Sequence, residues 1–135
     1  MDLVGIIGVL ITLRLTGLFL LTLCGSLIKC GDTQIYFNGF RIRIGRKVRS
    51  ILSNAEFQAV LQHENGHKVY FHVWKNFIRR SLFLPYPASL HEFQERQADS
   101  NVSDKKAFAR AILKLGIVSE LDRSRFLNAA SKGIW

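Results

Sequence analysis

The chain has 135 residues, in which 19 lysines and arginines against 10 aspartates and glutamates give a net charge of +9. This length has room for one domain of ordinary size. The basic residues are spread along the chain without the interleaved aromatic residues of a nucleic-acid-binding motif, so nucleic acid is not expected as a partner. The two cysteines have no second pair beside them, which excludes a cysteine metal site.

The first predicted element is a transmembrane anchor in residues 1–30. Residues 3–28 are almost wholly apolar, and as a helix they would be about 39 Å long, enough to cross a bilayer core of about 30 Å. Arg14 interrupts this run, and an arginine in mid-membrane costs about 2.5 to 3.5 kcal/mol. We expect Arg14 to pair with another subunit or a lipid headgroup, or else to mark a polar site within the membrane. A buried core helix is the alternative for the whole segment.

The placement of basic residues predicts the orientation of this single-pass anchor. Only the amino terminus and Asp2 precede the apolar run. Six basic residues follow it within 22 positions: Lys29, Arg41, Arg43, Arg46, Lys47 and Arg49. The positive-inside rule therefore puts residues 31–135 on the cytosolic side, with a basic face towards the anionic lipid bilayer.

A β-hairpin and several helices are expected after the anchor, which makes the fold class α+β. Asn38-Gly39 lies between two β-rich runs, the strongest short signal for a hairpin, and predicts strands near 34–37 and 40–44. Apolar and basic residues alternate in the second run. One face of that strand is therefore expected to be buried and the other to contact water.

Capping signals and prolines divide the remaining residues into helices. Ser53–Glu56 reads S-N-A-E, a capping box, and predicts a helix that continues to about Arg79–Arg80. Prolines 85 and 87 mark a loop. A second S-x-x-E box at Ser89–Glu92 predicts the next helix. Two more amphipathic helices are expected at 105–115 and 120–130.

The first of these helices contains the pattern H-E-x-x-H at residues 63–67. Histidines four residues apart lie one above the other on a helix face, so both imidazoles can reach one metal ion. Glu64 then points towards the same ion and can hold a water molecule on it. These residues lie on the inward stripe of the helix, where ionisable groups need a partner, and a metal ion satisfies them all.

A zinc ion would need a third protein ligand, and three residues near the start of the next helix are candidates: His91, Glu92 and Glu95. Glu92 is expected to close its capping box. Glu95 is favoured because Asp99, one turn later, could accept a hydrogen bond from the free N–H of a ligand histidine. His72 is expected to point elsewhere, as a surface or interfacial residue.

Three segments together resemble a known family: "LSNAEFQAVLQHENGH", "ERQAD" and "AFARAILKL" are similar to the HtpX-type and CAAX prenyl endopeptidases, membrane-associated gluzincin metalloproteases. The resemblance covers about residues 50–115. It implies a minimal zincin-like domain over residues 31–135, with an active-site helix and a glutamate helix. It also implies one Zn²⁺ per chain, with these roles: ligands His63, His67 and Glu95, general base Glu64, and Asp99 orienting a ligand histidine.

The sequence also departs from that family pattern. Asn65 stands where the family usually has an apolar residue, one apparent membrane span replaces several, and the membrane insert between the two motifs is missing. The β-lactam sensor-type membrane proteases are a second resemblance. They usually carry Cys-Asp where this chain has Ala98-Asp99.

The expected function is a membrane-anchored endopeptidase that hydrolyses protein or peptide substrates, membrane proteins among them, with zinc-activated water and a glutamate base. The substrate is expected to lie extended along an edge of the hairpin. His91 and Tyr86 are candidates for stabilising the oxyanion, although a structural role is the simpler alternative for each. The rival interpretations are a regulatory sensor-type protease and a non-catalytic zinc-containing membrane adaptor. Three ligands rather than a closed set of four favour catalysis.

Overall fold

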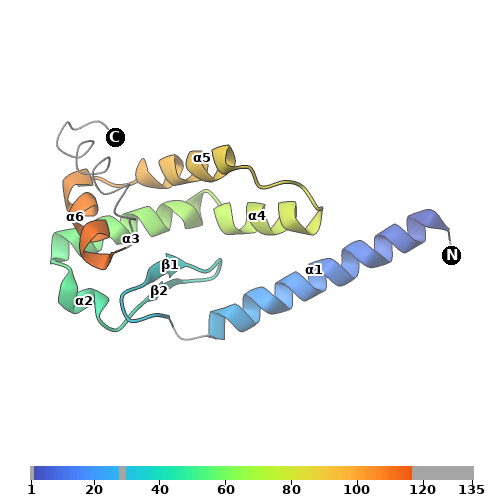
Figure 1. Ribbon diagram of the computed structural model, residues 1–135, viewed down its shortest axis with the longest axis horizontal. Coiled ribbons are helices and arrows are strands. Elements are labelled where there is room, and N and C mark those ends of the chain that lie inside the picture. Colours follow the sequence, from blue (N-terminus) through green and yellow to red (C-terminus); the bar gives the residue numbers. More distant parts are fainter. Residues whose placement is uncertain (1, 28–29, 117–135) are drawn as a thin grey trace.

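The structure is a computed structural model that describes residues 2–27 and 30–116. It is mostly helical with one small sheet, as the α+β class requires (Figure 1). The elements in chain order are α1 (Leu3–Leu27), β1 (Ile35–Phe37), β2 (Ile42–Ile44), α2 (Val48–Ile51), α3 (Asn54–Val69), α4 (His72–Ser81), α5 (Ala88–Asp99) and α6 (Lys105–Leu115). The helix expected at 120–130 lies outside the described residues.

Helix α1 projects from the rest of the chain (Figure 1). The Asp2 carboxylate accepts a hydrogen bond from the Gly5 N–H at 2.8 Å, which satisfies a free donor of the first turn. Its Leu3–Leu23 segment is long and apolar enough to cross a membrane, and its side chains are largely exposed. Within the chain, the Arg14 Nε donates a hydrogen bond to the Arg80 carbonyl at 3.0 Å, a contact that the sequence did not predict.

The two strands form the expected antiparallel hairpin, with Ile35 opposite Ile44 and Phe37 opposite Ile42. The strands are shorter than predicted, because the Asn38 side chain accepts from two backbone N–H groups and holds a longer turn. The buried face expected on the second strand is only partly present, since Ile42 packs against the core but is not fully buried. Ile35 and Phe37 are buried, whereas Ile44 is 36% exposed, because β1 is the strand that packs more closely on α3.

The apolar core lies where α3 packs against β1 and α6, with α2 packed against α6. Ser53 and Glu56 form the predicted capping box at the start of α3. Glu56 is only 2% exposed, and it also pairs with Lys114 at 2.8 Å and Arg110 at 3.5 Å on α6. The core residues are Ile35, Val48, Leu52, Phe57, Ala59, Val60, Val102, Ala107, Phe108, Ala111 and Leu115.

Two helix boundaries differ from the prediction. The helix expected to reach Arg79–Arg80 breaks at Phe71, whose φ of 56° is left-handed, so α4 starts on a new axis at His72. The second capping box does not form, because α5 starts directly after Pro87 and Ser89 lies inside the first turn. By contrast, α6 has the predicted bounds, and the Asp104 side chain caps it by accepting from the Ala107 N–H.

Candidate metal centre

Two helices supply the residues that meet at the centre. His63 and His67 lie one turn apart on α3, and Glu95 lies on α5. The two helices approach closely at Gly66: a Cβ added there would lie 2.7 Å from the Ala98 Cα. A residue without a side chain at position 66 therefore lets the backbone of α5 rest against α3, and this brings Glu95 to the two histidines.

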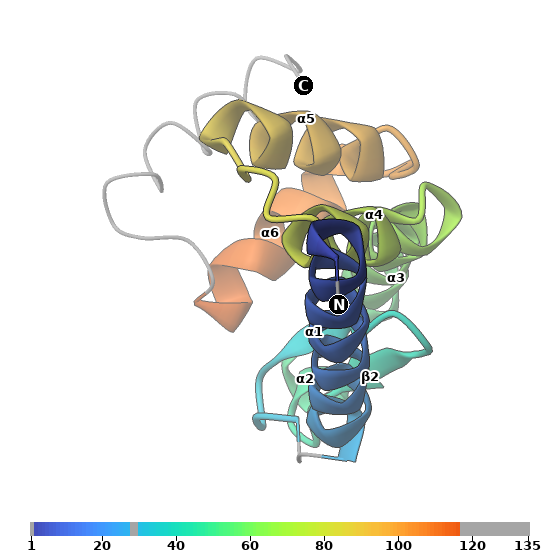
Figure 2. The same ribbon diagram turned by 90° about the vertical axis from the view of Figure 1, so that its right-hand side faces the viewer.

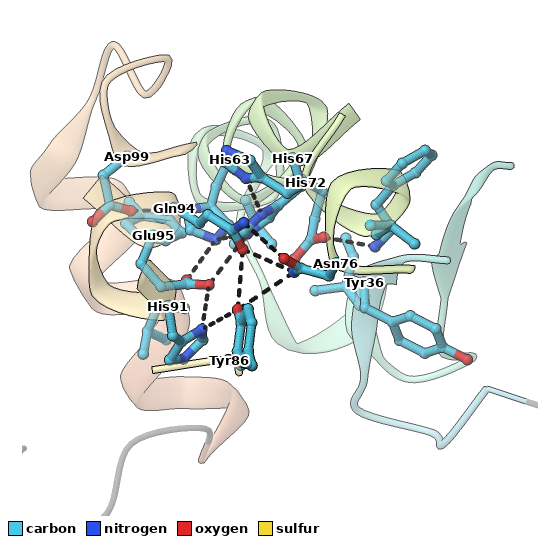
Figure 3. A pocket seen from close by; sticks show the side chains of 17 residues that line it. Tyr36, His63, His67, His72, Asn76, Tyr86, His91, Gln94, Glu95 and Asp99 are labelled. Atoms are coloured by element: carbon cyan, nitrogen blue, oxygen red, sulfur yellow. Dashed lines mark hydrogen bonds and ion pairs between the residues drawn. The ribbon is translucent and has the colours of Figure 1, made fainter. Parts of the chain in front are cut away.

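The three side chains converge on one point (Figure 3). The Nε2 atoms of His63 and His67 are 3.1 Å apart, and the Glu95 carboxylate oxygens lie 3.5 and 3.6 Å from them. All three ligand atoms lie within 4.8 Å of one another, so the group could hold a metal ion. Two imidazoles and one carboxylate are a donor set that zinc accepts. Glu92 is not part of this group, since its carboxylate pairs with Arg96 at 2.7 Å.

Asp99 orients the first histidine. Its Oδ1 lies 2.8 Å from the Nδ1 of His63. A carboxylate can only accept, so the His63 Nδ1 carries a proton and its Nε2 faces Glu95 and His67. The Phe108 ring stacks on the His63 imidazole at a centroid distance of 4.9 Å and fixes its plane from the core side.

His72 belongs to the centre, and the expectation that it points elsewhere is wrong. It is 2% exposed, and its Nδ1 lies 2.9 Å from the Nδ1 of His67. Its Nε2 lies 3.0 Å from the Oε1 of Gln97 on α5. The break at Phe71 turns α4 so that His72 faces His67 again (Figure 3). A continuous helix would have carried His72 to another face, and no sequence signal marks the break.

The hydrogen-bond chain from Gln97 sets the tautomer of His67. The Gln97 Oε1 accepts from His72 Nε2–H, which leaves the His72 Nδ1 as an acceptor. The His67 Nδ1 must then donate to it, so the His67 Nε2 presents a lone pair towards Glu95. With the Gln97 amide turned around, the proton of His67 would sit on the nitrogen that faces the centre. His72 thus orients His67 as Asp99 orients His63.

The pKa values of the two histidines are shifted in opposite directions. Burial alone would lower the pKa of His63, but its hydrogen bonds to Asp99 and Glu95 outweigh burial and raise that pKa to about 9. Burial lowers the pKa of His67 to about 4. Burial would raise the pKa of Glu95, yet the histidines around it hold that pKa below its usual value. At neutral pH His63 therefore carries a proton on each ring nitrogen, and a metal ion would have to displace the one on Nε2.

Glu64 joins the centre to the sheet. It is 9% exposed, and its Oε2 accepts a hydrogen bond of 2.7 Å from the Phe37 N–H of β1. Burial raises the pKa of Glu64 to about 7, against the lowering effects of His63 and of the Phe37 N–H. Glu64 and the three ligand residues line one cavity of about 570 Å³, together with Ile35 and Phe37 of β1. A carboxylate that gains and loses a proton near neutrality is suited to general acid–base chemistry.

Tyr86 and His91 line the same cavity at its exposed rim. The Tyr86 hydroxyl donates to the Gln94 Oε1 at 3.0 Å, and the His91 Nδ1 lies 3.6 Å from a Glu95 oxygen (Figure 3). Gln94 itself is buried and exchanges two hydrogen bonds of 2.9 Å with Asn76. Sequence reasoning missed Asn76 and Gln94, which join α4 to α5 beside the centre.

Comparisons with protein-family models, with curated proteins and with solved structures found no significant match to this chain.

Proposed function

We propose that the chain is a membrane-anchored, zinc-dependent endopeptidase with its catalytic domain in the cytosol. The observation that carries this proposal is the arrangement of four side chains on one cavity. His63, His67 and Glu95 form a three-membered donor set, and Glu64 lines the cavity beside them. Three protein ligands leave a coordination position open, whereas structural zinc sites usually have four.

A divalent metal ion held there would supply a Lewis acid that polarises the scissile carbonyl and acidifies a water molecule. The residues of the chain supply the proton transfer. Glu64 takes the proton from the attacking water and passes it to the leaving amine, and a pKa of about 7 lets it do both near neutral pH. Tyr86 and His91, at the rim of the cavity, are the candidate donors to the oxyanion.

The edge of β1 that faces away from β2 is the candidate site for an extended peptide substrate. Backbone groups of Gln34 and Asn38 bond to the β2 side of the hairpin, so those of Ile35 and Phe37 face the opposite edge. The Phe37 N–H on that edge already reaches Glu64. A peptide that added a strand here would run past the general base, since Ile35, Phe37 and Glu64 line the same cavity.

The function is tested by replacing Glu64 with glutamine in detergent-solubilised protein and measuring cleavage of unfolded membrane proteins. Glu64→Gln keeps the size of the side chain but cannot act as a base, so cleavage should fall by at least about 100-fold while zinc is retained. Glu92→Gln makes the same chemical change on an exposed glutamate outside the centre and should leave cleavage unchanged.

Two results would contradict the peptidase proposal. If Glu64→Gln cleaved every substrate as fast as the unmodified chain, Glu64 would not be the base. If the unmodified chain held zinc but cleaved none of the substrates, the adaptor interpretation would replace the protease. Zinc content measured on the same samples separates these results from simple loss of the metal.

A further inference from the structure

The turn between α4 and α5 is apolar and exposed. We call Leu82, Phe83, Leu84 and Pro85 the hairpin tip. Leu82 is 48% exposed, Phe83 66% and Leu84 46%. Phe83 also has a left-handed φ of 56°, a strained backbone for a bulky residue, although its ring is not buried in the protein. An exposed apolar cluster of this kind is unfavourable in water and marks a surface that contacts a membrane or another protein.

Contacts with α1 indicate whether a membrane or another protein covers the tip. The Arg14 guanidinium lies 3.8 Å from the centre of the Phe83 ring, and its Nε donates to the Arg80 carbonyl at the end of α4. Helix α4 packs alongside α1 (Figures 1 and 2), and the contacts of Arg14 place the tip near the middle of that helix. The apolar surface of the tip is thus continuous with the exposed surface of the candidate membrane span.

The backbone N–H groups of the tip find partners within α4, as a segment in lipid requires of its backbone donors, whereas the buried Nε of Arg79 beside the tip has none among the described residues. The N–H groups of Leu82, Phe83 and Leu84 donate to carbonyls of α4. Arg79 Nη2 donates to the Pro85 carbonyl at 2.8 Å, and Ser81 donates to the Phe77 carbonyl at 2.8 Å. Proline 85 has no N–H to satisfy. The Arg14 side chain caps the C-terminal end of α4, where a cation is favoured.

We propose that the hairpin tip is inserted into the acyl-chain region of the lipid bilayer beside α1, so that α4 and α5 form a re-entrant hairpin. Lys75 and Arg80 on α4 have exposed side chains. In this arrangement their long side chains would extend along the helix, so that the charged ends contact anionic lipid headgroups. Arg14 then caps the C-terminal end of α4 in apolar surroundings, and its guanidinium lies over the Phe83 ring. The proposal rests on the membrane anchoring proposed above for α1 and not on peptidase activity.

Insertion of the tip would also place the cavity close to the membrane. Asn76, Tyr86 and Gln94 on the same hairpin line the cavity that holds the metal ligands. Substrate segments that emerge from the bilayer would therefore reach β1 more readily than soluble peptides.

Depth-dependent fluorescence quenching in the full chain tests the proposal. Cys24 and Cys30 are first replaced by serine, and an environment-sensitive dye is attached to Phe83→Cys in vesicles of phosphatidylcholine and phosphatidylglycerol. Nitroxide groups on the lipid acyl chains should remove most of its fluorescence, while aqueous iodide should have little effect. Leu82→Cys, labelled likewise, guards against damage from replacing the strained Phe83.

Two control labels make the outcomes separable. A dye on exposed Lys106→Cys in α6 should respond to iodide and not to the lipid nitroxide. A dye on Leu10→Cys, 57% exposed in α1, should respond to the lipid nitroxide. If Leu10 responds and the two tip labels behave as Lys106 does, the tip lies in water and the proposal is wrong.

Tip labels shielded from both quenchers would mean that a second copy or another protein covers the tip, which also overturns the proposal. If the Leu10 label responds only to iodide, α1 is not in the bilayer, and the anchoring falls together with the insertion. Peptidase activity remains a separate measurement in every case.

Discussion

The candidate metal centre lies between two regions that are held together by different forces. One region is the core formed by α2, α3, α6 and β1, in which apolar residues such as Val60 and Phe57 are almost fully buried. The other is the α4–α5 hairpin, which is joined internally by the Asn76–Gln94 hydrogen bonds and exposes much of its apolar surface. The core stacks Phe108 on His63, whereas the hairpin supplies Glu95, the Asp99 carboxylate that orients His63, and the partner of His67.

This difference separates stability from metal binding. Packing interactions in the core hold the chain folded, so substitutions there should lower the free energy of unfolding. Polar contacts of the hairpin hold metal ligands in place, so substitutions there should lower metal affinity while the fold remains. Each of the following predictions tests one side of this comparison.

The largest effect is expected in the core. Phe57→Ala should lower the free energy of unfolding by about 3–5 kcal/mol, because a buried aromatic ring leaves a cavity. Phe93→Ala removes the same ring from the hairpin, where it is 56% exposed, and should change that free energy by less than about 0.5 kcal/mol. Denaturant titration followed by circular dichroism measures both. Equal losses in the two variants would remove the distinction between the regions.

The two orienting residues should have a smaller effect, on metal affinity. Asp99→Asn and His72→Ala should each weaken zinc binding about 10- to 100-fold, because a ligand histidine loses the partner that fixes its ring and tautomer. Gln97→Glu keeps the acceptor for His72 and should bind zinc nearly as the unmodified chain does. Competition with a fluorescent chelator measures these affinities. A normal affinity in His72→Ala would show that the hairpin does not orient His67.

The pH dependence of binding should have the smallest effect when it is expressed per pH unit. The pKa of His63 is raised to about 9, whereas that of His67 is lowered to about 4. Between pH 6 and 8 one proton must therefore leave His63 for each zinc ion bound, and affinity should rise about tenfold per pH unit. Calorimetry in two buffers with different ionisation enthalpies counts the protons released. An affinity that stays constant over this range would contradict the protonated state of His63.

The raised pKa of His63 also predicts how the stability of the folded chain depends on pH. A histidine whose pKa is raised on folding stabilises the folded chain fully below its unfolded pKa of 6.5. This contribution is lost as the pH rises through about 9. Zinc and protons thus compete for the same nitrogen, and bound zinc should replace the stabilisation that high pH removes.

Local features of the centre could be predicted from the sequence, and features that depend on neighbouring elements could not. The spacing of His63 and His67 follows from the helix period, and the capping box at Ser53 needs only the next three residues. The position of His72 depends on the left-handed conformation of Phe71, which propensity does not predict for a phenylalanine. The second capping box gave way to Pro87, whose fixed φ already suits the start of a helix.

The burial of the β1–β2 hairpin was not predictable for a similar reason. Alternation in the second strand indicates that one face is apolar, but not which strand lies closer to α3. The partner of Arg14 was equally hidden, because it is a backbone carbonyl 66 residues further along the chain. The helix period predicts that His63 and His67 lie close together on one helix, whereas the residues that orient them come from elements whose packing the pattern does not contain.

The most direct test of the three-ligand centre is the zinc content of three purified chains after dialysis, measured by mass spectrometry. The unmodified chain should hold one zinc per chain, and Glu92→Ala should hold the same, because Glu92 only pairs with Arg96 on the exposed side of α5. Glu95→Ala should lose most of the metal while circular dichroism still reports folded helices. Loss of zinc from Glu92→Ala but not from Glu95→Ala would contradict the centre described here.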